Sequence, residues 1–559
     1  MPYVVTQSCC SDASCVFACP VNCIHPTPDE PDFATAEMLY VDPAACVDCG
    51  ACVAACPVDA IMPHTKLAPA QQQFLSINAD FYRTPRARPT LAPVTLAPAV
   101  ARDREPLRVA IVGSGPAAMY AADELLTQPD VSVHVLDRLP TPYGLVRAGV
   151  APDHQHTKQV TALFDRIGEQ RGFRYFLNVS VPEHVTHEDL LEHHHAVIYA
   201  VGASADRRLG VPGADLDGCG SATDFVAWYN GHPDHAARNY DLASSRAVII
   251  GNGNVALDVA RVLTASPDAL ASTDIASHAL AALRSSRIEE VVIVGRRGLA
   301  QSAFTVPEFV GLLESPEVDV LLDAPDGAID ETTLGQERAG TLEHSVAWKL
   351  QLLRSLPRVS DAPAGGKRIV LRYLAAPVGF VGDRRVNGVE LAATAFTFDH
   401  GAMVEPTGAG DVLEAGLVLS SIGYRGVAVA GLPFDETTGV IPNESGRVPD
   451  RPGAYVAGWI KRGPTGFIGT NKSCSQETVR ALVADFNDGL LPEPAHDPGA
   501  FGRLVRSRRP AAVTGDGWRA IDAAERERGA AEGRPRSKVT DVAELVELAG
   551  RPRRRTLRR

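Results

Sequence analysis

Nine of the 11 cysteines lie within the first 56 residues, and the last four of these nine have a spacing that few folds can use. They read Cys46-x-x-Cys49-x-x-Cys52-x-x-x-Cys56-Pro57. This spacing is typical of a short chain that wraps an iron–sulfur cluster: three thiolates hold one cluster, and the fourth, before proline, turns toward a second. The sequence therefore predicts two clusters in a small N-terminal domain.

The second cluster is expected to draw on cysteines upstream of this run, where Cys19-Pro20-x-x-Cys23 follows Cys15 and the pair Cys9 and Cys10. We predict crossed ligation, in which each cluster takes ligands from both parts of the segment. The ligands predicted for one [4Fe–4S] cluster are Cys23, Cys46, Cys49 and Cys52. The ligands predicted for the other cluster are Cys15, Cys19, Cys56 and one of Cys9 or Cys10.

The upstream cysteines do not repeat the Cys-x-x-Cys-x-x-Cys spacing. Their Cys9-x5-Cys15-x3-Cys19 spacing resembles that of seven-iron ferredoxins, so this cluster is expected to be either [3Fe–4S] or [4Fe–4S]. A zinc site would need two Cys-x-x-Cys knuckles without Cys-Pro. A disulfide framework would suit a secreted protein, but the start MPYVVTQS lacks a basic region and an apolar region. These features favour clusters in a cytoplasmic protein.

The length of 559 residues predicts three or four domains. A hydrophobic content of 45% and a charged content of 22% are ordinary for a globular protein. The net charge of -13 argues against nucleic-acid binding, and no apolar run is long enough to cross a membrane. The basic end RPRRRTLRR is expected to be a solvated tail.

Alternating strands and helices are predicted from Leu107 onward. A strand at 107–113, a helix at 116–126 and strands at 131–137 and 196–202 form a first unit. The pattern then restarts, with a strand at 246–251, a helix at 254–263 and a strand at 289–295. Further strands are expected at 417–423 and 455–459, with a helical region from Cys474. Two βαβ units predict two nucleotide-binding domains, and no tandem repeat of short period is apparent.

The first unit carries a dinucleotide-binding fingerprint, Gly113-Ser-Gly115-x-x-Ala118, between a strand and a helix. Gly113 permits the tight turn, Gly115 lets the backbone approach a pyrophosphate, and the small Ala118 allows close packing. Asp137 ends the next strand, where a carboxylate can bind a ribose hydroxyl.

The second unit repeats this geometry in Gly251-Asn252-Gly253-Asn254-Val255, but its next strand ends in basic residues. Arg296 and Arg297 can bind a 2'-phosphate that an acid would repel. The second site is therefore predicted to prefer NADP(H).

A third glycine-rich block begins at Trp459 and includes Gly466, Phe467 and Ile468. Glycines allow the backbone to approach a flat ring, and an indole can stack beside one.

Together, GSGPAAMYAADELL, LPTPYGLVRAGVAPDH, GNGNVALDVARVL, VGRRG and GWIKRGPTGFIGTNK resemble the adrenodoxin reductase family of ferredoxin–NADP reductases. The N-terminal segment is similar to that of the ferredoxin-fused actinobacterial FprB type. The resemblance implies an α/β fold with two Rossmann-like three-layer domains, for FAD and NADP, preceded by a small α+β bacterial ferredoxin domain. The implied divisions are a two-cluster ferredoxin domain at 1–66, a Pro/Ala-rich linker at 67–106, an FAD domain at 107–212 and 412–559, and an NADP domain at 213–411.

The resemblance also implies site residues. Those for FAD are Ala118, Asp137, Leu145, Val181, Trp459, Gly466, Phe467 and Ile468, and those for NADP are Asn252, Gly253, Asn254, Val255, Arg296, Arg297, Glu308 and Gly466. His154 matches a histidine near the flavin, so His154 and Glu308 are the implied catalytic residues. The family's partner glutamate is Gly311 here, which weakens the case for a hydrogen-bond relay from His154.

The implied activity is hydride transfer from NADPH to FAD, followed by single-electron transfer to the fused clusters or to a separate ferredoxin. Expected partners are NADPH and a soluble ferredoxin or another acceptor such as a cytochrome P450 system, but neither nucleic acid nor a membrane. Residues 1–66 hold eight acidic residues and one lysine, so the ferredoxin is expected to dock on a basic face. Two alternatives are an electron-entry subunit similar to the glutamate synthase small subunit and a non-catalytic module with structural clusters.

Overall fold

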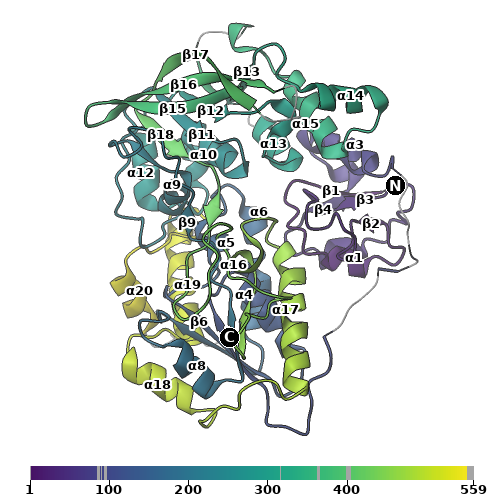
Figure 1. Ribbon diagram of the computed structural model, residues 1–559, viewed down its shortest axis with the longest axis vertical. Helices are drawn as coiled ribbons and strands as arrows, with labels where there is room; N and C mark the ends of the chain where they lie inside the picture. The colour runs from purple at the N-terminus through teal and green to yellow at the C-terminus, as the bar shows by residue number, and fades with distance from the viewer. Residues whose placement is uncertain are drawn as a thin grey trace.

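The computed structural model describes residues 2–84, 89, 91–92, 97–314, 317–361, 365–397 and 404–550. It has two large units, each built on a parallel sheet, and a small N-terminal domain that packs beside α13, α15 and α17 (Figure 1). Within these described ranges, no helix is long and apolar enough to cross a membrane. The predicted basic tail lies outside the described residues.

The N-terminal domain is built from short antiparallel pairs and short helices. Strand β1 (Tyr3–Val5) pairs with β4 (Ile61–Pro63), and β2 (Ile24–His25) pairs with β3 (Tyr40–Val41). Helices α1 (Ser14–Ala18) and α2 (Ala51–Ala55) follow the two cysteine loops. The domain is completed by η1 (His64–Lys66), η2 (Pro69–Gln72) and α3 (Gln73–Asp80).

This domain contains an internal repeat that the sequence analysis missed. Strands β1 and β2 and helix α1 each recur thirty-seven residues later, as β3, β4 and α2. Three pairs of cysteines have the same offset, namely Cys9 with Cys46, Cys15 with Cys52, and Cys19 with Cys56. A sequence signal was present, because CVFACPVNCI at 15–24 recurs as CVAACPVDAI at 52–61.

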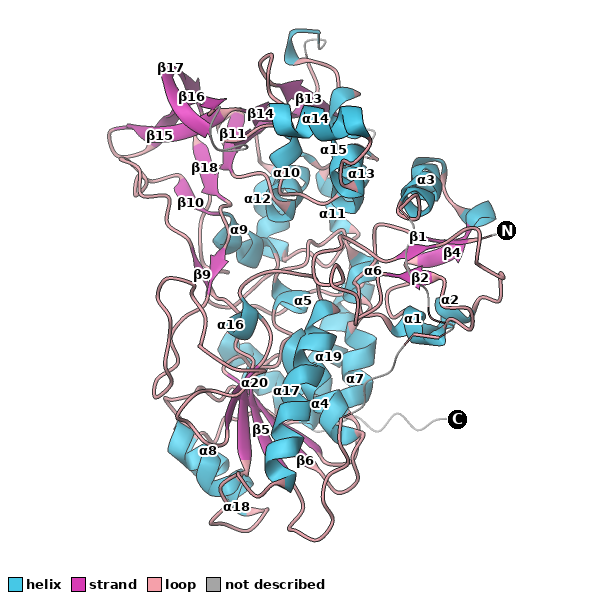
Figure 2. Cartoon of the chain, turned by 45° about the vertical axis from the view of Figure 1, so that its right-hand side comes forward, coloured by secondary structure: helices cyan, strands magenta, loops and turns pink. Residues whose placement is uncertain are grey.

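The first parallel sheet has the order β20-β8-β5-β6-β7. Its two faces alternate along β5: Val109 and Ile111 join the core with α4 and α17, whereas Ala110 and Val112 face α8 and α18 (Figure 2). Both faces are therefore covered by helices. The strands are β5 (Arg108–Val112), β6 (Ser132–Asp137), β7 (Phe173–Leu177), β8 (Ala196–Tyr199) and β20 (Ala454–Val456). The helices are α4 (Pro116–Leu126), α5 (Leu145–Ala148), α6 (Gln155–Lys158), α7 (Thr161–Gly168), α8 (His187–His193), α16 (Trp459–Arg462), α17 (Thr470–Asn487), α18 (Ala500–Arg508), α19 (Gly515–Ala531) and α20 (Val542–Ala549).

The second parallel sheet has the order β10-β18-β11-β12-β14-β13. Ala247 and Ile249 of β11 face α10, whereas Val248 and Ile250 pack against a three-stranded antiparallel sheet, β15-β16-β17. The third layer is thus a sheet and not a set of helices. The strands are β10 (Cys219–Ser221), β11 (Arg246–Ile250), β12 (Glu290–Gly295), β13 (Val318–Asp323), β14 (Lys367–Tyr373), β15 (Ala375–Gly382), β16 (Val386–Phe396), β17 (Val404–Glu414) and β18 (Leu417–Ser420). The helices are α9 (Ala222–Tyr229), α10 (Asn254–Thr264), α11 (Pro267–Ala271), α12 (Ser277–Arg284), η3 (Leu299–Gln301), α13 (Val306–Leu313), α14 (Glu331–Ala339), α15 (His344–Arg354) and η4 (Val359–Asp361).

Two predicted boundaries differ from the structure. Strand β18 pairs with β10 and β11, so the second unit continues beyond 412, and the chain returns through β19 (Tyr424–Arg425), which pairs with β9 (Ala205–Asp206). The predicted linker at 67–106 includes helix α3, whose Phe74 and Ile77, together with Phe81 just beyond it, pack into the core. The helical spacing of these three residues was masked by the Pro- and Ala-rich stretch that follows.

Candidate cofactor and electron-transfer sites

The first glycine turn joins β5 to α4, as the fingerprint predicted. Gly113 has a φ of +103°, and a Cβ there would lie 2.4 Å from the carbonyl oxygen of Ala200. A Cβ on Gly115 would meet no atom within 4 Å, so the backbone is open where a phosphate would approach. Ala118 is fully buried, which fits its predicted role in close packing.

Asp137 stands at the end of β6, next to this turn. Its carboxylate accepts hydrogen bonds from the backbone N–H of Ser114 (3.0 Å), from the Ser114 hydroxyl (2.5 Å) and from the backbone N–H of Leu139 (2.9 Å). Burial raises the pKa of Asp137, although these donors act in the opposite direction. Asp137 therefore braces the turn, and its contact with a ribose stays a prediction.

The remaining residues predicted for FAD lie on other elements. Leu145 is exposed at the first position of α5, and Val181 is partly buried. The Trp459 ring lies 5.3 Å from that of Tyr424, and its Nε1 donates to the carbonyl of Thr465 at 3.2 Å. Gly466 has a φ of +80°, and Phe467 and Ile468, which are half-buried, come just before α17.

The second glycine turn repeats the first. Gly251 has a φ of +109°, a Cβ there would lie 2.2 Å from the carbonyl oxygen of Ser421, and Gly253 is open like Gly115. Asn254 fixes the turn, because its Oδ1 accepts from the backbone N–H of Thr305 at 2.8 Å. Two further residues predicted for NADP, Asn252 and Val255, are half-buried beside it.

Arg296 and Arg297 follow β12 directly, and both are exposed. Neither guanidinium forms an ion pair with any residue in the described ranges. Two cations without a partner at this strand end are suited to a phosphate group.

His154 and Glu308 are brought together, with their Nε2 and Oε1 atoms 3.5 Å apart. Between them lies Arg261 of α10, which donates to Glu308 Oε1 at 2.9 Å and contacts His154 Nε2 at 2.7 Å. Arg261 also pairs with Asp153 and Asp258. The sequence analysis missed Arg261, Asp153 and Asp258. A signal was present, because two charges three residues apart interrupt the buried face of an apolar helix.

Oxygen and nitrogen atoms of His154, Asp258 and Glu308 lie within 4.8 Å of one another, as in a metal site. The Arg261 guanidinium already supplies the positive charge that these groups need, so a cation is not required. Burial lowers the pKa of His154, which keeps the ring neutral at neutral pH. Because Arg261 donates to Nε2, the neutral ring carries its proton on Nδ1.

All the cysteines in the described residues are free thiols, so no disulfide framework forms. One pocket is lined by five of them, namely Cys19, Cys23, Cys46, Cys49 and Cys52. This lining differs from the predicted ligand sets, in which Cys19 belongs to the other cluster, and the ligand assignment stays a prediction. By the internal repeat, Cys19 corresponds to Cys56, and each sulfur accepts from the N–H four residues later, at 3.4 Å from Cys23 and 3.3 Å from Ala60. Cys23 corresponds to Ala60, a position without a thiol.

The other group contains Cys9, Cys15 and Cys56. Burial raises the pKa of the Cys15 thiol, and the nearby Cys9 and Cys56 thiols raise it further. Cys10 is buried in a hydrophobic cluster that includes Tyr120 of the first unit. Cys56 thus lies near the upstream cysteines, and its role as a ligand there stays a prediction.

The N-terminal domain is docked on both large units. Gly469, which precedes α17, donates its N–H to the carbonyl of Cys10 at 2.7 Å. Lys472 Nζ donates to Ser14 Oγ at 3.1 Å. On the other unit, Lys349 of α15 pairs with Glu37 at 2.6 Å, with both side chains largely buried. This ion pair has the signs expected for an acidic ferredoxin on a basic face.

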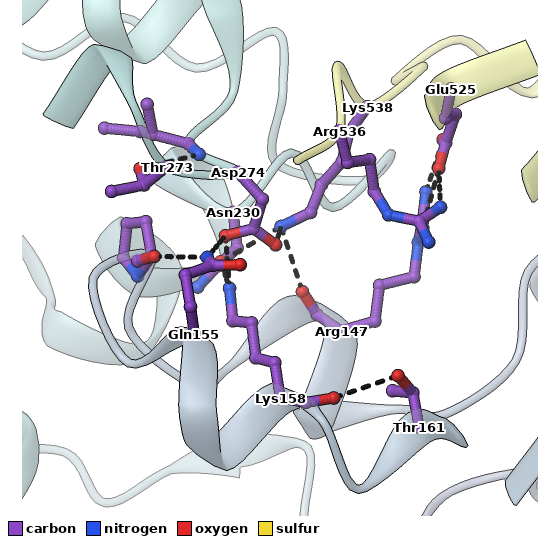
Figure 3. Close-up of polar contacts among 12 residues, drawn as sticks. Arg147, Gln155, Lys158, Thr161, Asn230, Thr273, Asp274, Glu525, Arg536 and Lys538 are labelled. Carbon is purple, nitrogen blue, oxygen red and sulfur yellow. Dashed lines mark hydrogen bonds and ion pairs between the residues drawn. The ribbon is translucent and has the colours of Figure 1, made fainter. Parts of the chain in front are cut away.

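The two large units are held together by a buried polar cluster (Figure 3). Asp274 of the second unit accepts from Lys158 of α6 at 2.6 Å and pairs with Lys538 of the C-terminal region at 2.8 Å. Burial would raise the pKa of Asp274, but the two lysines outweigh it and hold this pKa below its usual value. Nearby, Arg147 of α5 forms a bidentate pair with the buried Glu525. The Arg147–Glu525 pair lies within the first unit, whereas the contacts of Asp274 with Lys158 and Lys538 join the two units.

Comparisons with known proteins agree with this geometry. Residues 107–298 match the family model described as pyridine nucleotide-disulphide oxidoreductase, and residues 39–62 match the 4Fe-4S binding domain. The chain is 56% identical to a probable ferredoxin/ferredoxin–NADP reductase of Mycobacterium leprae, over 98% of each chain. It is 57% identical to a protein of the same name from Mycobacterium tuberculosis, over 100% of this chain and 97% of the relative. A structure of Mycobacterium tuberculosis FprA in complex with NADPH matches 79% of this chain and 99% of its own, with 44% identity and a TM-score of 0.75. Because such similar relatives are matched over nearly their whole length, the chain belongs to the family of ferredoxin/ferredoxin–NADP reductases.

Proposed function

We propose that this chain is an NADPH-dependent reductase that delivers electrons to iron–sulfur clusters fused in the same polypeptide. The observation that carries the proposal is the hydrogen bond between Gly469 and Cys10. It joins the block predicted to hold FAD to the loop predicted to hold the upstream cluster. When bound, NADPH supplies a hydride, FAD accepts it as an electron pair, and the clusters accept electrons singly.

The two glycine turns are suited to the two nucleotides. The open backbones at Gly115 and Gly253 and the starts of α4 and α10 would face the pyrophosphates. Arg296 and Arg297 would bind the 2'-phosphate of NADPH, which makes the second unit the NADP domain and the first the FAD domain. Gly466 and Trp459 would lie against the flavin.

His154 is proposed as a positioning residue and not as a proton donor. Its neutral ring is held by Arg261, whose charge is balanced by Glu308, Asp153 and Asp258. Glu308 thus takes part in a hydrogen-bonded network although Gly311 stands where the family has a glutamate. The network fixes the loop before α6 against α10 and α13, where the two domains meet.

The proposal includes two clusters with revised ligands. The downstream cluster would be a [4Fe–4S] cluster held by Cys19, Cys46, Cys49 and Cys52, which line one pocket. Cys19 is chosen over Cys23 because the repeat matches Cys19 with Cys56, the residue that joins the other group. Cys23 would be a fifth thiol beside this cluster. The upstream cluster would take Cys9, Cys15 and Cys56.

From the docked arrangement we also propose the order in which the two clusters carry electrons. The upstream loop contacts the FAD domain through Cys10, whereas Cys49 of the downstream loop is exposed. Electrons would therefore leave by way of the upstream cluster, then the downstream cluster, and reach an external acceptor at the Cys49 end. A separate ferredoxin or a cytochrome P450 system fits this role. Thiolate-ligated clusters need a reducing compartment, so we place the protein in the cytoplasm.

The contact at Gly469 gives a direct test. A Cβ on Gly469 would lie 2.1 Å from the backbone nitrogen of Asp12, so Gly469→Ala should push the cluster loop away from the FAD domain. Rapid mixing with NADPH under anaerobic conditions, followed by absorbance and freeze-quench EPR, would separate flavin reduction from cluster reduction. We expect cluster reduction to slow roughly tenfold to hundredfold, because a small displacement of two reacting groups strongly lowers the rate of the reaction between them.

The matched control is Gly335→Ala in α14, where a Cβ meets no atom within 4 Å. It should leave both phases as in the wild type. Unchanged cluster reduction in Gly469→Ala would contradict the proposed electron path, and an absence of NADPH-dependent flavin reduction in the wild type would contradict the proposed function itself.

A further inference from the structure

The chain segment that leads into helix α13 is bound to the second glycine turn. Asn254 Oδ1 accepts from the backbone N–H of Thr305 at 2.8 Å, and Asn254 Nδ2 donates to the Thr305 hydroxyl at 3.2 Å. Asn252 Oδ1 accepts from the backbone N–H of Ala303 at 3.4 Å. The turn proposed for the pyrophosphate of NADP(H) and the start of α13 are therefore connected directly.

The N-terminus of α13 is capped by a side chain of another domain. Val306 is the first residue of the helix, so its backbone N–H has no partner within the helix. Glu37 Oε2 of the ferredoxin domain accepts from this N–H at 2.6 Å. Thr305, the N-cap residue, does not cap the helix with its own side chain. A carboxylate suits this place, because its hydrogen bond is charge-assisted and the helix dipole favours negative charge there.

Glu37 is itself held by Lys349 of α15, which lies beside α13 and the ferredoxin domain (Figure 1). Glu37 Oε1 pairs with Lys349 Nζ at 2.6 Å, and the two side chains are only 11% and 9% exposed. Lys349 Nζ also donates to the carbonyl of Ser302 at 3.5 Å. The same lysine thus binds both the capping carboxylate and the segment that leads into the capped helix, and burial limits the screening of this pair by salt.

The first turn of α13 also carries Glu308, which is predicted to contact NADP. Glu308 Oε1 accepts from Arg261 at 2.9 Å, so its position depends on where the first turn lies. A looser first turn would therefore disturb both Glu308 and the contacts of Asn254. A binding site that is already ordered binds its ligand more tightly, because the cost of ordering is not paid on binding.

We propose that Glu37 of the ferredoxin domain is a positioning residue for NADP(H), because it caps α13 and so orders the segment shared by Glu308 and the second glycine turn. This inference rests on the proposed function, since it needs NADP(H) to bind at that turn. It makes the fused ferredoxin a part of the NADP site as well as an electron outlet. Coupling between two binding events is reciprocal, so bound NADP(H) holds the ferredoxin domain more firmly on α13 and α15.

The test uses the full chain, loaded with flavin and clusters, as wild type, Glu37→Ala, Glu37→Gln and Asp29→Asn. Asp29 is an exposed acid whose carboxylate accepts from Thr27 within the ferredoxin domain, so Asp29→Asn removes the same charge away from α13. Anaerobic calorimetry with NADP+ gives the Kd without turnover. Rapid mixing with NADPH gives the limiting rate of flavin reduction, and flavin and iron per chain show whether each variant is loaded.

Hydrogen exchange with and without NADP+ tests the reciprocal effect. Peptides that cover 33–41 report on the ferredoxin domain around Glu37, and peptides that cover 302–313 report on α13 and the segment before it. In the wild type, NADP+ should slow exchange in both regions. In Glu37→Ala, NADP+ should no longer slow exchange at 33–41.

We expect Glu37→Ala to raise the Kd for NADP+ about threefold to tenfold, as for the loss of a helix cap. The limiting rate of flavin reduction at saturating NADPH should stay as in the wild type, because the cap acts on binding and not on hydride transfer. Glu37→Gln keeps an oxygen that can accept from Val306, so its Kd should rise less. Asp29→Asn should bind NADP+ like the wild type.

An equal Kd for NADP+ in the wild type and Glu37→Ala would overturn the inference. So would an equal rise in Asp29→Asn, since the effect would then come from the net charge of the ferredoxin domain. Should Glu37→Ala lose its clusters, Glu37→Gln decides by the same measurement. If the wild type itself bound no NADP+, the proposed function would be wrong, and this result differs from the others because it needs no variant.

Discussion

The proposed FAD domain and the proposed NADP domain begin with the same turn and differ at one strand end. Gly113 and Gly251 have φ angles of +103° and +109°, and each is pressed against a carbonyl of a neighbouring strand. After the next strand, however, the FAD domain has Asp137, which is bound to its own turn, and the NADP domain has the exposed Arg296 and Arg297. The shared backbone leaves room for a pyrophosphate at each turn, whereas the two strand ends, in the proposed function, select different nucleotides.

The comparison depends on the two domains keeping their positions, so the largest effect is expected at their interface. Asp274→Ala would leave Lys158 and Lys538 buried without a counter-charge and should lower the free energy of unfolding by about 3–5 kcal/mol. Because the lysines lower the pKa of Asp274, its stabilising contribution is present above about pH 4 and is lost as the pH falls below that value.

Urea unfolding of the wild type and of Asp274→Ala at pH 7 would measure this loss, and repeating it below pH 4 would test its pH dependence. Asp268→Ala, at an exposed position of α11, is the matched control. If the two variants were equally stable, the polar cluster would not hold the domains together.

Replacing Gly113 or Gly251 with alanine should disrupt one nucleotide site and leave the other intact. Alanine at either position combines a positive φ with a clash against a carbonyl, which should destabilise the chain by about 2–4 kcal/mol. Gly113→Ala should lose bound flavin, and Gly251→Ala should retain flavin but bind NADPH weakly. Flavin per chain and the Kd for NADPH distinguish these results, and the opposite pattern would reverse the assignment of the two domains.

Replacing Arg296 and Arg297 tests whether their strand end selects NADPH over NADH. Charge-assisted hydrogen bonds contribute about 1.5–3 kcal/mol each, so the double alanine variant should raise the KM for NADPH roughly tenfold or more and leave that for NADH nearly unchanged. Arg287→Ala, an exposed arginine before the other end of β12, controls for loss of charge. An unchanged preference for NADPH over NADH in the double variant would refute the role of these arginines.

The last comparison concerns acid sensitivity. Burial lowers the pKa of His134 to about 3 and that of His194 well below its usual value, and the two rings are hydrogen-bonded at 2.8 Å in the FAD domain. The unfolded chain takes up these protons first, so stability is full above about pH 6.5 and falls below it, by about 1.4 kcal/mol per pH unit for each histidine.

Flavin release during acidification would follow this loss. Replacing His134 with Phe and His194 with Leu should flatten the pH dependence, whereas His156→Gln, at an exposed position, should not change it. An equal slope in all three proteins would mean that other groups govern the acid response.

Much of each site was predictable because its chemistry is local. A strand, a glycine turn and a helix follow one another in the chain, so Gly113, Gly251 and Arg296 could be placed without knowing their neighbours. The network around His154 could not be completed in this way. Arg261 is separated from Asp153 by more than one hundred residues, and only folding shows that the charge inside an apolar helix has partners on another domain.

The sequence by itself determined the order of strands and helices, the two nucleotide turns and the presence of a cluster-binding segment, because each depends on residues within one or two turns of chain. Only the tertiary structure decided that Cys19 lies in one pocket with Cys46, Cys49 and Cys52, and that Cys10 packs in a hydrophobic cluster of the first unit. These choices depend on which face of a loop meets which neighbour. That is set by packing between segments far apart in the chain, and spacing along the chain does not record it.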